Sequence, residues 1–246
     1  ETLSLSSKCL LEQATWIQEP VREALLAGTE TALESVLTEV CRDSTGLPVY
    51  TLDLFTEEFC DALLEELDHL EESGIPLRRP NGMNRYGAIL SQLGFQDNFL
   101  LPLTTLVMAP FARMLWPEWV SPDDCGETYG FVVRYRMGED VDLQEHSDTS
   151  NVTLNVCLGR EFTGGELYFK GVRFTASEDD VEENIVGHVK GRAMLHLGGH
   201  RHAALPITSG ERSNLIVWAT APGGVVRIRP DPDAKKKQKR LVCGLS

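Results

Sequence analysis

The sequence contains no long apolar run and few basic residues. No segment of its 246 residues approaches the roughly 18 consecutive apolar residues that a membrane-spanning helix requires, so we expect no membrane span. Its 23 lysines and arginines face 37 aspartates and glutamates, which gives a formal net charge of −14. Such a charge repels nucleic-acid backbones and attracts cationic peptides. We therefore expect no nucleic-acid partner. An acidic net charge is equally typical of a protein in which the charge only maintains solubility.

The cysteines include no Cys-x-x-Cys motif and no closely spaced pair. This spacing excludes a zinc framework, and a chain of this length needs no disulfide scaffold. We expect mostly reduced thiols, which favours an intracellular protein. The chain opens at Glu1 without an initiator methionine, so we expect a fragment or a trimmed chain, and the missing signal peptide carries little weight. The six cysteines are Cys9, Cys41, Cys60, Cys125, Cys157 and Cys243.

An apolar content of 42% and a charged content of 24% are ordinary for a folded protein. The length fits one large domain, or one domain with a helical N-terminal extension. We expect a helical N-terminal segment (1–45), a helical support (46–125), a β-rich domain (126–222) and a basic tail (230–246). The tail carries the sequence KKKQKR at residues 235–240. We expect it to be disordered, either as a solvated charge run or as a nuclear address or docking patch.

Helical patterns dominate the first half. Residues 29–40 form the best early helix candidate, and residues 49–54 alternate like a short strand. Thr56 is a suitable N-cap for an amphipathic helix over 57–72, whose first turn is acidic. Residues 99–115 predict a second, mostly apolar and buried helix.

The second half predicts short strands separated by glycine-rich turns. Residues 151–158 alternate, with Val152, Leu154, Val156 and Leu158 on one face and Asn151, Thr153, Asn155 and Cys157 on the other. The other expected strands are 131–136, 166–169, 192–197 and 214–220. This order predicts an α+β, mainly β fold, a sandwich or barrel of the jelly-roll kind with helices packed outside.

A His-x-Asp motif is the first sign of chemistry. In an extended segment His146 and Asp148 project to the same face, so an imidazole and a carboxylate can meet one metal ion. Two histidines and one carboxylate leave positions open, which suits non-haem Fe(II) that handles O2. The motif alone is a weak signal.

The third ligand should come from a later strand. His196, His200 and His202 share parity, so alternation cannot choose among them. The segment after His202 favours that residue. Residues 208–210 (Thr-Ser-Gly) are typical of a turn, so we predict His202 and Arg212 on neighbouring antiparallel strands that point into one cavity.

Arg212 begins a predicted strand whose other residues are mostly apolar. A buried arginine needs an anionic partner, and its planar fork suits bidentate capture of a carboxylate. The alternative is that Arg212 lies at the strand mouth and pairs with a surface acid.

The ordered set of His-x-Asp, a distant His-x-x-x-Pro and an arginine ten residues after that histidine resembles the Fe(II)/2-oxoglutarate-dependent dioxygenases of the prolyl and lysyl hydroxylase branch. FVVRYR at 131–136, TLNV at 153–156, Gly-Gly at 164–165 and HRH at 200–202 look like the catalytic domain of procollagen lysyl hydroxylases. FCDALLEEL at 59–67 and NGMNRYG at 81–87 are closer still to the 2-oxoglutarate and iron-dependent oxygenase domain-containing group of this family. The resemblance covers roughly residues 45–222.

This resemblance implies a double-stranded β-helix and a set of site residues. His146, Asp148 and His202 would be the Fe(2+) ligands, and Arg212 would bind the distal carboxylate of 2-oxoglutarate. Tyr135 resembles the tyrosine that lines the co-substrate pocket. O2 would be the second co-substrate, and L-ascorbate dependence is implied by the resemblance alone. Retention of the carboxylate ligand favours hydroxylation.

Several other polar residues have expected positions near the site or at the surface. We expect Asn155 to point towards the co-substrate, and Asn84 to lie in a loop near the mouth that touches substrate or serves as a structural turn. We expect His196 to be a core residue or a neighbour of the ligands, and His200 to be such a neighbour or to line the substrate cleft. The remaining two, His69 and His188, are expected at the surface.

Three functions compete. The first is an active dioxygenase that hydroxylates a lysyl or prolyl side chain of a protein, and the acidic charge of the chain suits a basic peptide. The second is a jelly-roll binding module that has lost catalysis, which the complete set of ligands and Arg212 disfavours. The third is a nucleic-acid demethylase, whose pattern has a second arginine six residues after the first; here that position is Trp218.

Overall fold

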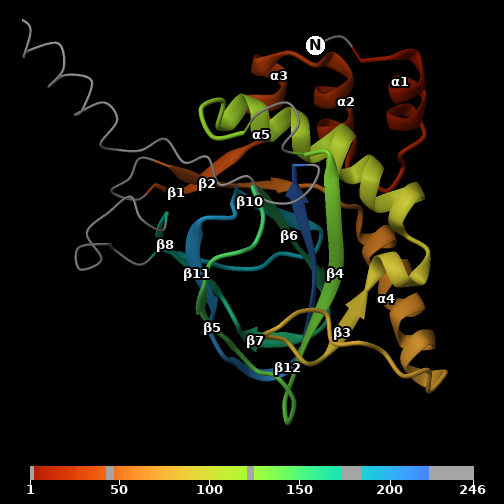
Figure 1. Ribbon diagram of the computed structural model, residues 1–246, viewed down its shortest axis with the longest axis vertical. Helices are drawn as coiled ribbons and strands as arrows, with labels where there is room; N and C mark the ends of the chain where they lie inside the picture. Colours follow the sequence, from red (N-terminus) through yellow and green to blue (C-terminus); the bar gives the residue numbers. More distant parts are fainter. Residues whose placement is uncertain (1–2, 43–46, 121–124, 173–183, 222–246) are drawn as a thin grey trace, which may run out of the picture.

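The computed structural model describes residues 3–42, 47–120, 125–172 and 184–221 (Figure 1). The predicted basic tail lies outside these residues. The α-helices are α1 (Leu5–Glu12), α2 (Glu19–Ala27), α3 (Glu30–Glu34), α4 (Glu57–Glu72) and α5 (Ala109–Leu115). Three further helical segments are η1 (Leu90–Leu93), η2 (Gln96–Leu100) and η3 (Leu103–Met108).

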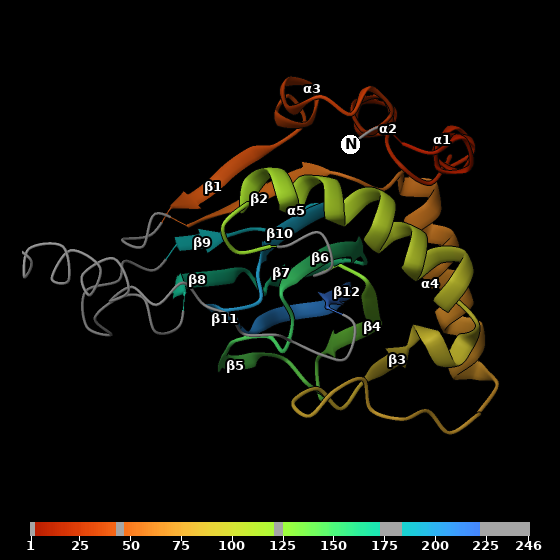
Figure 2. The ribbon, with the colours of Figure 1, turned by 45° about the horizontal axis from the view of Figure 1, so that its top comes forward.

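The strands form two antiparallel sheets. The larger sheet has the order β1-β2-β10-β6-β12-β4-β3, with β7 paired to β12, and the smaller has the order β5-β11-β8-β9. Their bounds are β1 (Thr38–Arg42), β2 (Pro48–Asp53), β3 (Gly87–Ile89), β4 (Glu127–Arg136), β5 (Leu143–His146), β6 (Val152–Gly159), β7 (Phe162–Gly164), β8 (Leu167–Val172), β9 (Asn184–Val186), β10 (Arg192–Leu197), β11 (His200–Ala204) and β12 (Ile207–Thr220). The predicted jelly roll is confirmed, and Figure 2 shows the helices gathered outside it.

The larger sheet is buried on both faces. In β6 every residue is buried, because alternate side chains enter two different cores. Leu154 and Val156 join the core beneath the helices, together with Leu215 of β12. Phe131 of β4 instead faces the smaller sheet and packs in a second core with residues such as Phe169 of β8. The predicted alternation of 151–158 therefore separates a helix-facing side from a side that faces the interior between the sheets.

Helix α4 forms as its sequence predicts. The hydroxyl of Thr56 accepts a hydrogen bond from the backbone N–H of Phe59, which caps the first turn. Cys60 and Leu63 then point inward and are buried against the larger sheet.

The helical stretch Gln96–Leu115 is long and apolar enough to cross a membrane by length and composition alone. Half of its most apolar window is buried inside the fold, however. Leu103, Val107 and Phe111 are almost fully buried in the helix-facing core. Its apolar character is therefore accounted for by packing on the larger sheet.

The helix predicted over 29–40 is wrong in its second half. Helix α3 ends at Glu34, and residues 38–42 form β1, which extends the larger sheet through antiparallel pairing with β2. The backbone hydrogen bonds of an exposed sheet edge override the local helical pattern here.

The predicted hairpin between His202 and Arg212 is also wrong. Residues 208–210 lie within β12, and β11 pairs with β5 and β8 rather than with β12. The chain crosses from one sheet to the other at Leu205 and Pro206, since proline lacks the N–H that would continue the ladder. His202 and Arg212 thus belong to opposite sheets.

Candidate functional site

Two imidazoles and a carboxylate meet between the sheets. The ligand atoms that His146, Asp148 and His202 can offer all lie within 4.8 Å of one another. Asp148 Oδ1 is 3.5 Å from Nε2 of His146, and its Oδ2 is 3.8 Å from Nε2 of His202. In the part of the chain that the structure describes, this is the one group of three or more such side chains spaced to hold a metal ion.

Hydrogen bonds fix the orientation of both imidazoles. Nδ1 of His146 lies 2.8 Å from the carbonyl of Gln144, and Nδ1 of His202 lies 3.0 Å from the carbonyl of His200. A carbonyl only accepts, so each Nδ1 carries the proton and donates it. In the uncharged form of each ring, Nε2 then turns an unshared electron pair towards the cluster, as metal-bound histidines require.

Asp148 is held as an anion. Burial alone would raise the pKa of its carboxyl, but His202, His146 and His196 hold it well below its usual range. Thr153 adds a hydrogen bond, donating its hydroxyl to Oδ2 at 2.6 Å. The carboxylate thus stays charged although the residue is only 6% exposed.

A cavity runs from this cluster towards Arg212. The guanidinium of Arg212 is buried, with the ring centre of Tyr135 4.5 Å from its Cζ. Among the described residues no carboxylate forms an ion pair with it, so the predicted surface alternative is wrong. The cavity is lined by the cluster and by further polar side chains, namely His146, Asp148, His202, Asn84, Tyr135, Asn155, Arg212 and Asn214.

The predicted asparagines join this cavity. Asn84 donates to the hydroxyl of Tyr135 at 3.2 Å, and Asn155 accepts from the amide of Asn214 at 2.6 Å. Asn214 was not predicted. Alternation along β12 could have found it, because it lies two residues after Arg212 and therefore on the same face.

Residues 9–121 match the OGFOD2-like domain family. The chain is 45% identical over 181 residues to 2-oxoglutarate and iron-dependent oxygenase domain-containing protein 2 of Xenopus tropicalis, which covers 72% of this chain and 50% of that protein. The chain contains an OGFOD2-like domain. It spans about half the length of this relative.

More distant proteins are similar to parts of this chain. The chain is 34% identical over 195 residues to multifunctional procollagen lysine hydroxylase and glycosyltransferase LH3 of Rattus norvegicus, covering 74% of this chain and 24% of that protein. The structure of the non-heme alpha-ketoglutarate-dependent epimerase SnoN from nogalamycin biosynthesis has a TM-score of 0.51 at 17% identity, covering 80% of this chain and 89% of that one. This shows that the fold is that of the 2-oxoglutarate and iron oxygenases.

Two further histidines lie behind the cluster. His196 is fully buried, and its Nε2 is 4.0 Å from Oδ2 of Asp148. His200 turns away, with Nε2 3.0 Å from the carbonyl of Leu47, so it does not line the cavity. A register irregularity between His200 and His202 accounts for the difference in direction. His69 is exposed, as predicted.

The prediction that His188 lies at the surface is wrong. Its side chain is half-buried, and its Nε2 lies 2.5 Å from Nη1 of Arg212. It belongs to the loop before β10, where no periodic pattern indicates the direction of a side chain.

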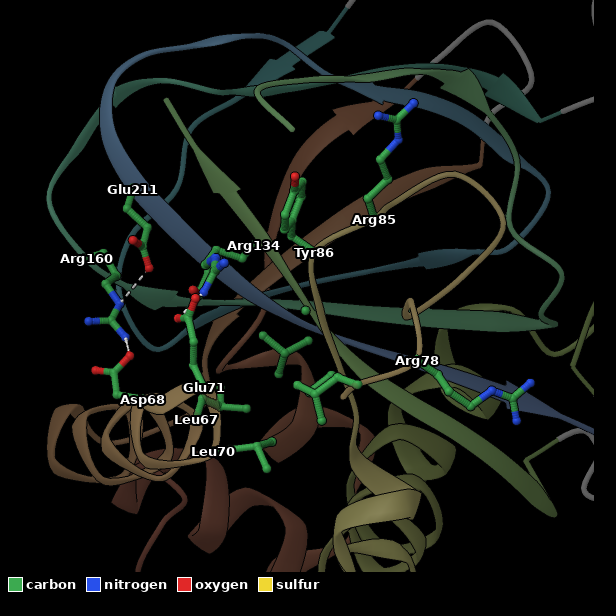
Figure 3. Close-up of a pocket in the computed structure, with 15 residues that line it drawn as sticks. Leu67, Asp68, Leu70, Glu71, Arg78, Arg85, Tyr86, Arg134, Arg160 and Glu211 are labelled. Atoms are coloured by element: carbon green, nitrogen blue, oxygen red, sulfur yellow. Dashed lines mark hydrogen bonds and ion pairs between the residues drawn. The ribbon is translucent and has the colours of Figure 1, made fainter. Parts of the chain in front are cut away.

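A second hollow, of about 230 Å³, lies on the outside of the larger sheet between α4, β3 and β4 (Figure 3). Several of its charged side chains pair with one another. Arg160 contacts Asp68 and Glu211, and Arg134 contacts Glu71. It contains none of the clustered metal-ligand side chains, so we assign the chemistry to the cavity between the sheets.

Proposed function

We propose that this chain is an Fe(II)- and 2-oxoglutarate-dependent dioxygenase that hydroxylates a lysyl or prolyl side chain of a protein. The observation that carries this proposal is one cavity lined by two functional groups. These are the cluster of His146, Asp148 and His202 and the buried, unneutralised guanidinium of Arg212.

The cluster fits ferrous iron. Two imidazole nitrogens and one carboxylate on one side of an ion match the donor set of non-haem iron oxygenases and leave other positions open. When bound there, iron with 2-oxoglutarate and O2 supplies the oxidation of a substrate C–H, and the balance is one alcohol, one succinate and one CO2.

The chain's own residues bind and orient the co-substrate. Arg212 meets the distal carboxylate of 2-oxoglutarate with its fork of N–H donors, in a site that excludes most water. Tyr135 and Asn155 line the same cavity as Arg212 and the cluster. Thr153 holds Asp148 in position through its 2.6 Å hydrogen bond.

Two observations support a protein substrate. The similarity to procollagen lysine hydroxylase LH3 supports lysine as a target. The net charge of −14 favours a basic segment around it.

The test is coupled turnover with purified protein, Fe(II), ascorbate and labelled 2-oxoglutarate. A panel of lysine- and proline-containing peptides is compared with the same peptides carrying alanine at those positions. We expect succinate formation that the peptides stimulate, and a product heavier by one oxygen atom. An iron-loaded protein that forms no succinate with or without any peptide would favour the catalytically inactive binding module. Omission of ascorbate from the same assay tests the predicted dependence on it.

A further inference from the structure

Arg212 is held at one nitrogen of its guanidinium, Nη1, by two acceptors that carry no charge. Its Nη1 donates to the carbonyl of Gly165 and to Nε2 of His188. Its Nε–H has no hydrogen-bond partner among the described residues. The protein therefore orients the guanidinium without neutralising its charge.

The contact also defines the state of the imidazole. A guanidinium only donates, so Nε2 of His188 must be the unprotonated ring nitrogen. Burial, and then the charge of Arg212, lower the pKa of His188 to about 3. The ring is thus uncharged at neutral pH. An aspartate or glutamate in its place would form an ion pair with Arg212 and compete with a carboxylate ligand.

We propose that His188 is a positioning residue for the co-substrate, because it fixes the guanidinium of Arg212 so that the remaining edge meets the distal carboxylate of 2-oxoglutarate. This inference rests on the proposed function and extends it to the loop before β10. The ring of Phe162 lies beside both groups, with its centre 6.3 Å from that of His188 and 5.9 Å from Cζ of Arg212. It limits the movement of the pair.

The test is equilibrium binding of 2-oxoglutarate to the full chain loaded with Mn(II), measured by calorimetry without turnover. His188→Gln keeps an uncharged acceptor and should bind within about threefold of the wild type. His188→Leu loses one hydrogen bond to a charged group and should bind about tenfold more weakly. His188→Glu is close in size to the glutamine variant but supplies a competing anion, and should bind at least about a hundredfold more weakly.

Pyruvate serves as the control ligand because it lacks the distal carboxylate, so its binding should be the same in all variants. Mn(II) affinity and melting temperature report whether the site is intact. If the leucine variant fails to fold, the glutamine and glutamate pair decides. Equal 2-oxoglutarate affinity in that pair would overturn the role of His188. Absence of metal-dependent 2-oxoglutarate binding in the wild type would instead overturn the proposed function.

Discussion

His202 lies directly opposite His146 in the antiparallel register of β11 and β5. Facing residues on neighbouring strands have closely spaced Cβ atoms, and the two ring centres are 4.3 Å apart. The smaller sheet thus brings two histidines that are 56 positions apart in the sequence into one site. Asp148 follows directly after β5, where its backbone N–H donates to the carbonyl of Gly198.

Removal of the guanidinium should weaken co-substrate binding. Arg212→Leu loses a buried, charge-assisted pair, so we expect the 2-oxoglutarate concentration for half-maximal succinate formation to rise by about a hundredfold. Arg192→Leu is the matched control, since Arg192 lies on the same sheet but pairs with exposed Asp53. Equal effects of the two substitutions would show that another group holds the distal carboxylate.

Thr153→Val should weaken metal binding with little change in shape. The substitution removes the hydroxyl that donates to Oδ2 of Asp148, and loss of such a support typically lowers metal affinity about tenfold or more. Titration with Mn(II) measures this. Thr163→Val, which changes an exposed threonine of β7, should leave the affinity unchanged. An unaltered affinity in Thr153→Val would mean that packing alone orients the carboxylate.

Gly165→Ala should disturb Arg212 as well as the backbone. Gly165 has φ +75°, and an added Cβ would lie 3.1 Å from Nη1 of Arg212 and 2.8 Å from Cγ2 of Ile207. We expect a loss of stability of about 1–2 kcal/mol and weaker 2-oxoglutarate binding. Gly74→Ala shares the positive φ but meets no atom within 4 Å, so it should show only the loss of stability. Normal 2-oxoglutarate binding in Gly165→Ala would show that the guanidinium tolerates displacement.

The stability of the protein should depend on His188 in acid. Its pKa is lowered from 6.5 to about 3 in the folded chain, so the unfolded chain binds more protons between these values. The free energy of unfolding should therefore fall as pH decreases below about 6.5. The His188→Gln variant lacks this contribution. Between pH 7 and pH 5 its free energy of unfolding should therefore fall by on the order of 1 kcal/mol less than that of the wild type. Urea unfolding at the two pH values measures the difference, and parallel losses would contradict the shift.

Local patterns predicted the elements that depend on local interactions. The Thr56 cap and the spacing of apolar residues gave the bounds of α4, and alternation gave the two faces of β6. Parity also grouped His202 with His196 and His200. His196, however, lies on β10 of the larger sheet, and a register irregularity in β11 falls between His200 and His202. The segment after His202 favoured that residue through a predicted hairpin, which the structure does not contain, whereas the family resemblance implied the same ligand independently.

Features set by long-range pairing escaped prediction. Residues 38–42 form a strand because β2 offers a partner, and the crossing at Pro206 places His202 and Arg212 on opposite sheets. His188 lies in a loop without periodicity, so its contact with Arg212 emerges only once the sheets are assembled. Polar residues on one face of a strand are visible in the sequence, whereas the group that a loop brings to them is not.

The central measurement compares iron-dependent succinate formation by the wild type and by Asp148→Ala under the same conditions, with melting temperature as the measure of folding. Asp53→Ala, which removes an exposed aspartate paired with Arg192, is the matched control. We predict succinate from the wild type and from Asp53→Ala, and none from a folded Asp148→Ala protein. An Asp148→Ala protein that forms succinate at the wild-type rate would contradict the assignment of the site.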